Sequence, residues 1–141
     1  MLCDQHVVKM TLETAQLLCS THDKAPYKRT HYSHPCAIWT RASSANYMWL
    51  CAYGRAVAAE YTYRFGKQHA SEVVIRWAAA NRPRCVRAEL TPFAQAMPEQ
   101  YRGDCAVAAY KRYYVAEKLG LRGKSTWRRR DVPAWVSEVA E

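Results

Sequence analysis

The 141-residue chain lacks several features that mark whole classes of protein. It has no uninterrupted apolar run long enough to cross a bilayer, so a membrane-spanning protein is not expected. It has no low-complexity tract and no internal repeat, which argues against a disordered tail or a solenoid. No segment alternates apolar and polar residues as a half-buried strand does, so the sequence predicts no sheet.

Acidic residues are scarce relative to basic ones. The chain has 12 Asp and Glu against 21 Lys and Arg, which gives a formal net charge of +9. An excess of this size favours a polyanionic partner, because phosphate neutralisation supplies most non-specific nucleic-acid affinity. The alternative is a protein that is basic without binding nucleic acid.

The chain also lacks any C-x-x-C pair, although it has six cysteines. Zinc-ribbon spacing is therefore absent. The first residues, MLCDQHVVKM, do not form the apolar run of a secretory signal. We therefore predict a cytoplasmic protein, in the host cytoplasm if it is phage-encoded, with reduced and mostly buried thiols rather than disulfides.

What the chain does have is helical periodicity. Apolar residues recur at three- and four-residue steps in four segments, which predicts helices over 2–20, 36–65, 69–80 and 104–119. Gly66 and Gly120 are expected to end the second and fourth helices, and Asp104 to cap the fourth. Prolines and polar residues mark 21–35 and 81–103 as loops. The prediction is one all-α domain over 1–141, with about four helices, an aromatic core and a basic, aromatic tail at 121–135.

The first helix carries a polar line between two apolar strips. His6, Lys9, Glu13 and Gln16 follow one another at helical spacing, so they share one side of the helix. Because the strips on either side should be buried, this line is expected to face a cleft. A carboxylate there could do acid–base work or stabilise a cation. The alternative is a structural seam in which these side chains pair with one another.

Three motifs in the same order resemble one family. They are Asp4-Gln5-His6 in the first helix, MPEQYRGD at 97–104, and Glu117-Lys118 followed by Thr126-Trp127 near the C-terminus. Together they resemble the phage-type pyrimidine-dimer DNA glycosylase/AP lyase (endonuclease V-like) family, whereas the middle helix matches in pattern only.

The resemblance implies a small helical enzyme that needs no metal and no cofactor. In this family the amine of the processed N-terminus attacks the sugar C1′ and forms an imine, and a glutamate stabilises the cationic sugar. The resemblance places that glutamate at Glu13, with His6 beside it, and assigns sugar-phosphate contacts to Arg102 and Lys118. The partner would be double-stranded DNA that is distorted, damaged or modified, from which a base is extruded.

The chain departs from the family pattern in three places. Only three residues precede Asp4, so an amine on Met1 would lie roughly 18 Å from Glu13 along one helix. Leu12 and Gln16 stand where the family has arginines. Residues 27–36 are not recognisably similar.

Several basic and aromatic residues are candidates for contact with DNA. Trp127 could act as an aromatic wedge beside a run of three arginines, unless this tail is simply solvated. The full set of candidates is Lys9, Lys28, Arg29, Arg102, Lys118, Trp127, Arg128, Arg129 and Arg130.

A minor alternative concerns a metal. His22, His31, His34 and Cys36 lie close in sequence, in an imperfect zinc pattern on a predicted loop. We favour stacking or phosphate contacts for these histidines and predict no metal site.

The leading hypothesis is therefore a DNA-binding protein of the glycosylase type, acting on damaged or modified pyrimidines. One rival is a non-catalytic DNA-binding module. The other is a phage accessory protein that binds a host protein through exposed Trp127 and Trp135.

Overall fold

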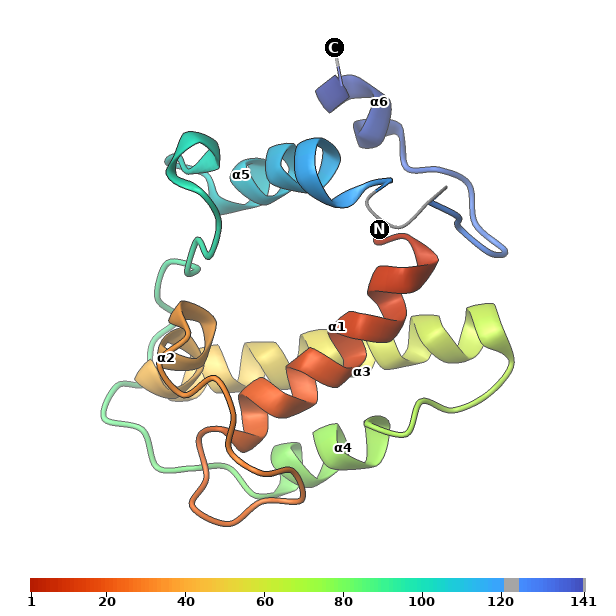
Figure 1. Cartoon of the computed structure of the whole chain (residues 1–141). Coiled ribbons are helices and arrows are strands. Elements are labelled where there is room, and N and C mark those ends of the chain that lie inside the picture. Colours follow the sequence, from red (N-terminus) through yellow and green to blue (C-terminus); the bar gives the residue numbers. More distant parts are fainter. Residues whose placement is uncertain (121–124, 141) are drawn as a thin grey trace.

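The computed structural model describes residues 1–120 and 125–140, and in this part the chain forms helices and no strand. The predicted all-α class is therefore confirmed. The elements in chain order are α1 (Asp4–Cys19), α2 (Pro35–Ala42), α3 (Ser44–Phe65), α4 (Glu72–Ala80), the 3-10 helix η1 (Glu99–Tyr101), α5 (Ala106–Tyr113), the π-helical turn η2 (Tyr114–Lys118) and α6 (Ala134–Ala140) (Figure 1).

The helices form two groups. Helices α1 to α4 pack on one another and make the core group, in which α1 lies against α2, α3 and α4. The elements η1, α5, η2 and α6 make the C-terminal group, in which α5 contacts each of the other three. Within the described residues the backbones of the two groups of helices do not approach closely, and side chains make the contacts between them. Figure 1 shows the C-terminal group lying across from α1 and α3.

The buried face of α1 differs from the predicted one. The strip that contains Val7 and Leu18 is buried as expected, but Val8 and Leu12 in the second strip are 39% and 40% exposed. Thr11 and Thr14 occupy the interior instead. Thr11 tolerates burial because its hydroxyl donates a hydrogen bond to the Val7 carbonyl at 2.8 Å. A polarity pattern alone assigns threonine to the surface, which explains the error.

Gly54 lets α1, α3 and α4 approach closely. A Cβ at this position would lie 2.7 Å from Thr14 Cγ2 and 3.1 Å from Ile75 Cδ1. Glycine is otherwise unfavourable inside a helix, by about 1 kcal/mol relative to alanine. The close approach therefore explains why a glycine occupies the middle of α3.

We expect Gly54→Ala to lower the free energy of unfolding by about 1–3 kcal/mol, because the steric cost of overpacking exceeds the gain in helix propensity. Urea unfolding followed by circular dichroism measures this. The control is Ala52→Gly, an exposed position on the same helix, which reports propensity alone. A Gly54→Ala variant as stable as the wild type would show that the three helices have room to move apart.

Residues 36–65 were predicted to form one helix, but they form two, α2 and α3. The backbone at Ser43 is extended, with φ −148° and ψ 156°, and its hydroxyl accepts a hydrogen bond from the Asn46 N–H at 3.0 Å. Ser43 thus ends α2 and caps α3. Gly66 ends α3 as predicted, in the left-handed conformation at φ 70°, and its N–H donates to the Thr62 carbonyl.

The C-terminal third also differs from the prediction. Helix α5 begins after Cys105 rather than Asp104 and passes into the π-helical turn after Tyr113. Gly120, at φ 81°, follows the end of this turn. Helix α6 was not predicted, because 121–135 was expected to be a tail. The first four tail residues, 121–124, lie outside the described residues.

The predicted burial of the cysteines and of the tryptophans is correct only in part. All six thiols are free, but only Cys3, Cys19 and Cys51 are buried, and Cys105 is exposed. Trp39 belongs to the core as predicted, whereas Trp49 is 39% exposed and stacks on Tyr53. None of the described helices is both long and apolar enough to cross a membrane.

Candidate functional site

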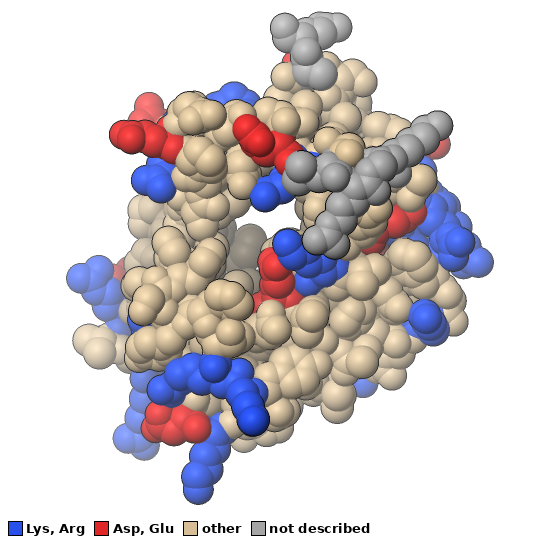
Figure 2. All heavy atoms as spheres, in the orientation of Figure 1, with Lys and Arg blue, Asp and Glu red and all other residues tan. Residues whose placement is uncertain are grey.

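An opening separates the two groups of helices. It is visible in the space-filling view, where basic and acidic side chains stand together at its edge (Figure 2). Two side-chain bridges connect the groups across it. The Tyr110 hydroxyl of α5 lies 3.9 Å from Cys36 Sγ of α2. The Tyr114 hydroxyl of η2 accepts a hydrogen bond from the Cys3 N–H at 3.0 Å and lies 2.7 Å from His6 Nδ1.

Glu13 lies two helical turns along α1 from His6, on the side from which His6 reaches Tyr114 of the C-terminal group, so it faces this opening. Its carboxylate is 3.3 Å from Lys9 Nζ, and the side chains of Glu13 and Lys9 are 39% and 61% exposed. Burial raises the pKa of Tyr53 to about 12, and the charge of Glu13 adds to the shift. The pKa of Cys36 is also raised, first by burial and to a smaller extent by Glu13. Glu13 is therefore close to both α2 and α3, and solvent reaches it.

His6 has a structural partner. Its ring lies 5.0 Å from the Tyr114 ring, edge-on, and its Nδ1 is also 3.2 Å from Cys3 Sγ. Burial is the main reason that the pKa of Tyr114 lies well above its ordinary value, so this hydroxyl stays protonated. His6 thus helps to tie η2 to the start of α1, two helical turns from Glu13.

The amine of Met1 lies near the opposite end of α1 from Glu13. Burial lowers its pKa, and the nearby charges of Lys111 and Arg64 lower it further, while Glu60 opposes them. The helical rise from Asp4 to Glu13 is on the order of 14 Å. The structure therefore does not bring this amine and Glu13 together.

Asp4 holds the tail segment against the core group. Its carboxylate accepts hydrogen bonds from the Thr126 hydroxyl at 2.7 Å and from the Arg128 N–H at 2.9 Å. It also pairs with Arg64 at 3.0 Å. Burial alone would raise the pKa of Asp4, but these contacts outweigh burial and hold it below its ordinary value.

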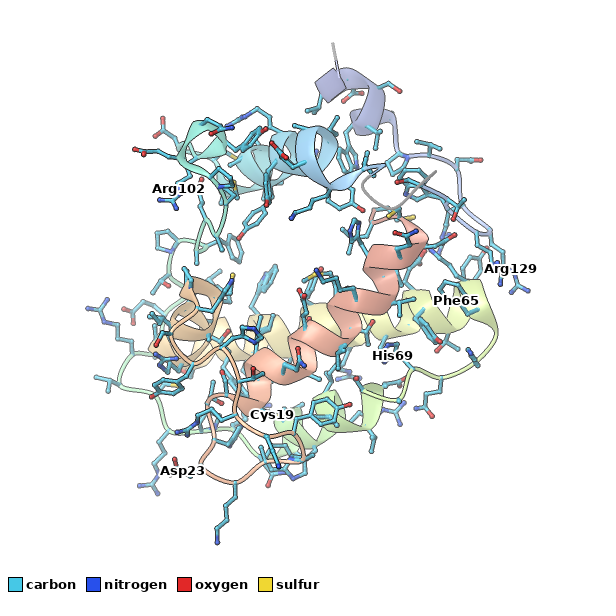
Figure 3. The ribbon with its side chains drawn as sticks, viewed as in Figure 1. Cys19, Asp23, Phe65, His69, Arg102 and Arg129 are labelled. Carbon is cyan, nitrogen blue, oxygen red and sulfur yellow. The ribbon has the colours of Figure 1, made fainter. Side chains whose placement is uncertain are left out.

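The arginines of the tail are directed back onto the protein. Arg130 makes two hydrogen bonds to the Glu60 carboxylate, at 2.9 and 3.0 Å. Arg129 donates to the Tyr63 carbonyl, and the Arg128 guanidinium lies 5.5 Å from the Phe65 ring. Figure 3 shows Arg129 and Phe65 beside the end of α3. The alternative of a simply solvated tail is therefore wrong.

Trp127 is half-buried, and its enclosed indole N–H has no hydrogen-bond partner among the described residues. Trp135 is also half-buried, with its ring 5.9 Å from the ring of Tyr114. The expectation that both rings are exposed anchors is wrong. Presentation of Trp127 to a partner would require a movement of the tail.

The remaining predicted cations do not gather in one place. Lys28 lines a broad groove of about 520 Å³ together with Leu12 and Gln16. Arg29 pairs with Asp23 at 2.9 Å. Arg102 donates to the Met97 carbonyl, and the Lys118 ammonium lies 4.8 Å from the Tyr113 ring. In Figure 3, Arg102 lies beside the C-terminal group, far from Arg129.

The histidine cluster of the loop is dispersed. His22 Nε2 lies 2.9 Å from the Tyr47 hydroxyl, and His34 caps α2 by accepting a hydrogen bond from the Cys36 N–H. His31 lies 2.9 Å from the Thr30 hydroxyl. In the described part of the chain, no group of three His, Cys, Asp or Glu side chains could hold a metal ion.

Sequence reasoning missed the side chains that connect the two groups. Tyr110 of α5 and Tyr114 of η2 are four residues apart, so they share one side of this segment. This spacing could have indicated that both side chains contact the same neighbouring surface. Asp4 belongs to the Asp4-Gln5-His6 motif, but no structural role was predicted for its carboxylate. Comparison of the chain with protein-family models, curated proteins and solved structures gave no match.

Proposed function

We propose that the protein binds distorted or damaged double-stranded DNA and that the opening between the two groups of helices receives a damaged or modified pyrimidine nucleotide. The reaction proposed is that of a DNA glycosylase/AP lyase, with Glu13 stabilising the cationic sugar. The observation that carries this proposal is the half-exposed Glu13–Lys9 pair at the opening. The net charge of +9 supports a polyanionic partner.

The hydroxyl of Tyr53, which feels the charge of Glu13, is compatible with such a site. The pKa of Tyr53 is raised to about 12, chiefly by burial, so this group remains neutral at cellular pH. Neutral hydroxyls can donate hydrogen bonds to sugar or base oxygens without repelling phosphate. No metal or cofactor enters the proposed reaction.

A second candidate is a non-catalytic DNA-binding module. The ion pair between Glu13 and Lys9 favours it, because this pair satisfies the carboxylate without any catalytic role. The half-burial of Trp127 and Trp135 gives less support to a third candidate, a module that binds a host protein.

One experiment separates the three candidates. The protein is incubated with an abasic-site duplex and borohydride, which reduces an imine between a protein amine and C1′ to a stable covalent bond. A trapped adduct is expected for the glycosylase/lyase. Salt-sensitive binding without an adduct would select the non-catalytic module. The absence of both would overturn DNA binding and favour a protein partner.

Trp127→Ala is expected to weaken binding to a distorted duplex severalfold more than binding to an intact one, since an inserted ring gains most where stacking is already disrupted. Fluorescence anisotropy with both duplexes measures this. Trp77→Ala removes another half-buried tryptophan, on α4, and is the control. Equal losses on both duplexes would refute the wedge role.

A further inference from the structure

Residues 82–90 form an exposed loop, here called the arginine loop, that the proposed function does not use. Its sequence, RPRCVRAEL, places three arginines within six residues, and Arg82, Arg84 and Arg87 are all exposed. None of them takes part in an ion pair within the described part of the chain. The one acidic side chain of the loop, Glu89, accepts a hydrogen bond from the Ala88 N–H.

The loop backbone is fixed to the core group. The N–H groups of Ser44 and Ala45, at the start of α3, donate to the carbonyls of Arg87 and Ala88 at 3.0 and 3.2 Å. Just beyond the loop, the Thr91 N–H donates to Asn46 Oδ1 at 2.9 Å. The loop arginines are therefore mounted on an ordered backbone, so less conformational entropy is lost when they bind a partner.

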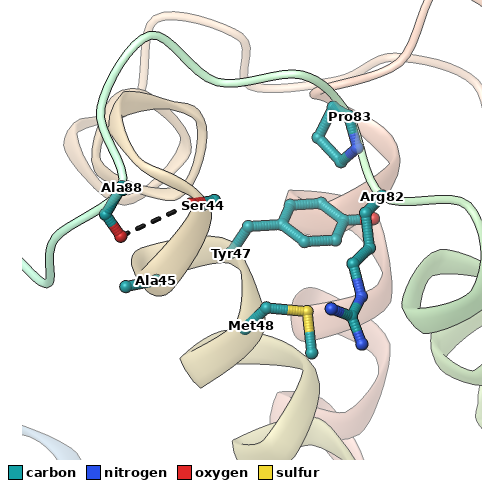
Figure 4. A pocket seen from close by; sticks show the side chains of 7 residues that line it. All are labelled: Ser44, Ala45, Tyr47, Met48, Arg82, Pro83 and Ala88. Atoms are coloured by element: carbon teal, nitrogen blue, oxygen red, sulfur yellow. Dashed lines mark hydrogen bonds between the residues drawn. The ribbon is translucent and has the colours of Figure 1, made fainter.

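The base of the loop is hollowed. A pocket of about 200 Å³ lies between the start of α3 and the loop. Arg82 and Pro83 form its wall on the loop side, and Tyr47 and Met48 form the wall on α3 (Figure 4). Next to it, Val86 projects fully into solvent, and Leu90 is 50% exposed. This surface thus combines a recess with guanidinium groups that form no ion pair within the described residues.

The arginines of the loop differ from those of the tail in their side-chain partners. The tail arginines were predicted to contact phosphate, but Arg130 is neutralised by Glu60 and Arg129 is bound to a carbonyl. Arg82 donates to the Ala79 carbonyl, whereas the guanidinium groups of Arg84 and Arg87 make no ion pair within the described residues. Guanidinium groups bind phosphate oxygens in bidentate geometry, which suits them to a nucleic-acid backbone.

The loop is also close to the opening. Cys36, in the first turn of α2, lies at the edge of the opening, and Ser43, directly after α2, forms a backbone bridge with Arg87. Seven residues of helix span on the order of 10 Å, or about three base pairs of DNA. We infer that the arginine loop is a second phosphate-contacting surface, which binds the DNA backbone a few base pairs from the nucleotide at the opening. This inference rests on the proposed function.

The test compares two double variants of the full chain with equal loss of charge. Arg84→Gln/Arg87→Gln changes the loop, and Arg55→Gln/Lys67→Gln removes two exposed cations of α3 and the residues after it. Binding to a 20-base-pair abasic-analogue duplex is measured by anisotropy at several salt concentrations. We expect the line of log K against log salt to become less steep by about 2 in the loop variant, since each lost phosphate contact removes about 0.9 from the magnitude of its slope.

We also expect the loop variant to bind at least about tenfold more weakly near 100 mM salt, with a much smaller change in the control. Equal losses in both variants would overturn the inference while leaving the proposed function intact. A wild-type protein that binds no duplex would overturn both. Binding of a polyglutamate peptide that depends on the loop, with no loss of DNA binding, would assign the surface to a protein partner and overturn the inference.

Discussion

Arg64→Met is expected to lower the free energy of unfolding by about 3–5 kcal/mol at neutral pH. The Arg64 side chain is completely buried and pairs with Asp4 at 3.0 Å and with Glu60 at 2.7 Å. It also donates to the Leu2 carbonyl at 2.9 Å. Methionine fills a similar volume, but it leaves two largely buried carboxylates without their shared cation. Urea unfolding measures the change.

The loss should depend on pH in a defined direction. The pKa of Glu60 is lowered, first by the hydrogen bond from Arg130 and then by Arg64, and the pKa of Asp4 is lowered as well. A carboxyl group whose pKa is lowered by folding stabilises the protein above its unfolded pKa, near 4, and this contribution disappears as the pH falls through the folded pKa. The difference between the wild type and Arg64→Met should therefore shrink below about pH 4.

A matched control is available on α4. Arg76 pairs with Glu72 one helical turn away, but its side chain is 64% exposed. Arg76→Met is expected to cost no more than about 0.5 kcal/mol, because solvent screens such a pair. If Arg64→Met lowered the free energy of unfolding no more than Arg76→Met does, the result would contradict the view that the buried network of Asp4, Glu60 and Arg64 holds the start of α1 to α3 and to the tail.

Glu13→Gln is expected to reduce the rate of borohydride-trapped adduct formation by about 100-fold or more. The substitution removes the charge that stabilises a cationic sugar and keeps nearly the same shape. Folding should be little affected, because the pair with Lys9 is solvent-exposed and contributes at most about 0.5 kcal/mol. Adduct formation is followed on denaturing gels, with thermal unfolding measured in parallel.

The control for this substitution is Glu72→Gln, an equal change of charge in another pair at i and i+4, on α4. It should leave the rate of adduct formation unchanged. An unaltered rate in Glu13→Gln would remove Glu13 from the proposed reaction, even if the protein binds DNA tightly.

Helical periodicity and glycine positions predicted much of the core group. The first helix, the third helix over 69–80 and the end of α3 at Gly66 follow from local pattern and capping chemistry. The break at Ser43 does not, because serine is common inside helices and its hydroxyl acts as a cap only when the backbone turns there. Helix α6 was missed because the segment before it is rich in arginine and ends at Pro133.

The candidate site was predictable only on one side. The polar line of α1 could be read from spacing, and Lys9 and Glu13 do lie together at the opening. The other side depends on contacts more than 70 residues apart in sequence, such as Tyr110 with Cys36 and Tyr114 with His6. Such contacts leave no local pattern. For the same reason the neutralisation of Arg130 by Glu60 could not be foreseen.

The most direct test of the account is the equilibrium affinity of Glu13→Gln for a non-cleavable abasic-analogue duplex near 150 mM salt. If DNA lies at the opening, loss of the Glu13 carboxylate should tighten binding severalfold, while Glu72→Gln has a smaller effect. Charges farther away than about 8 Å are largely screened under these conditions. An affinity unchanged from the wild type would show that DNA does not approach Glu13 and would contradict the account.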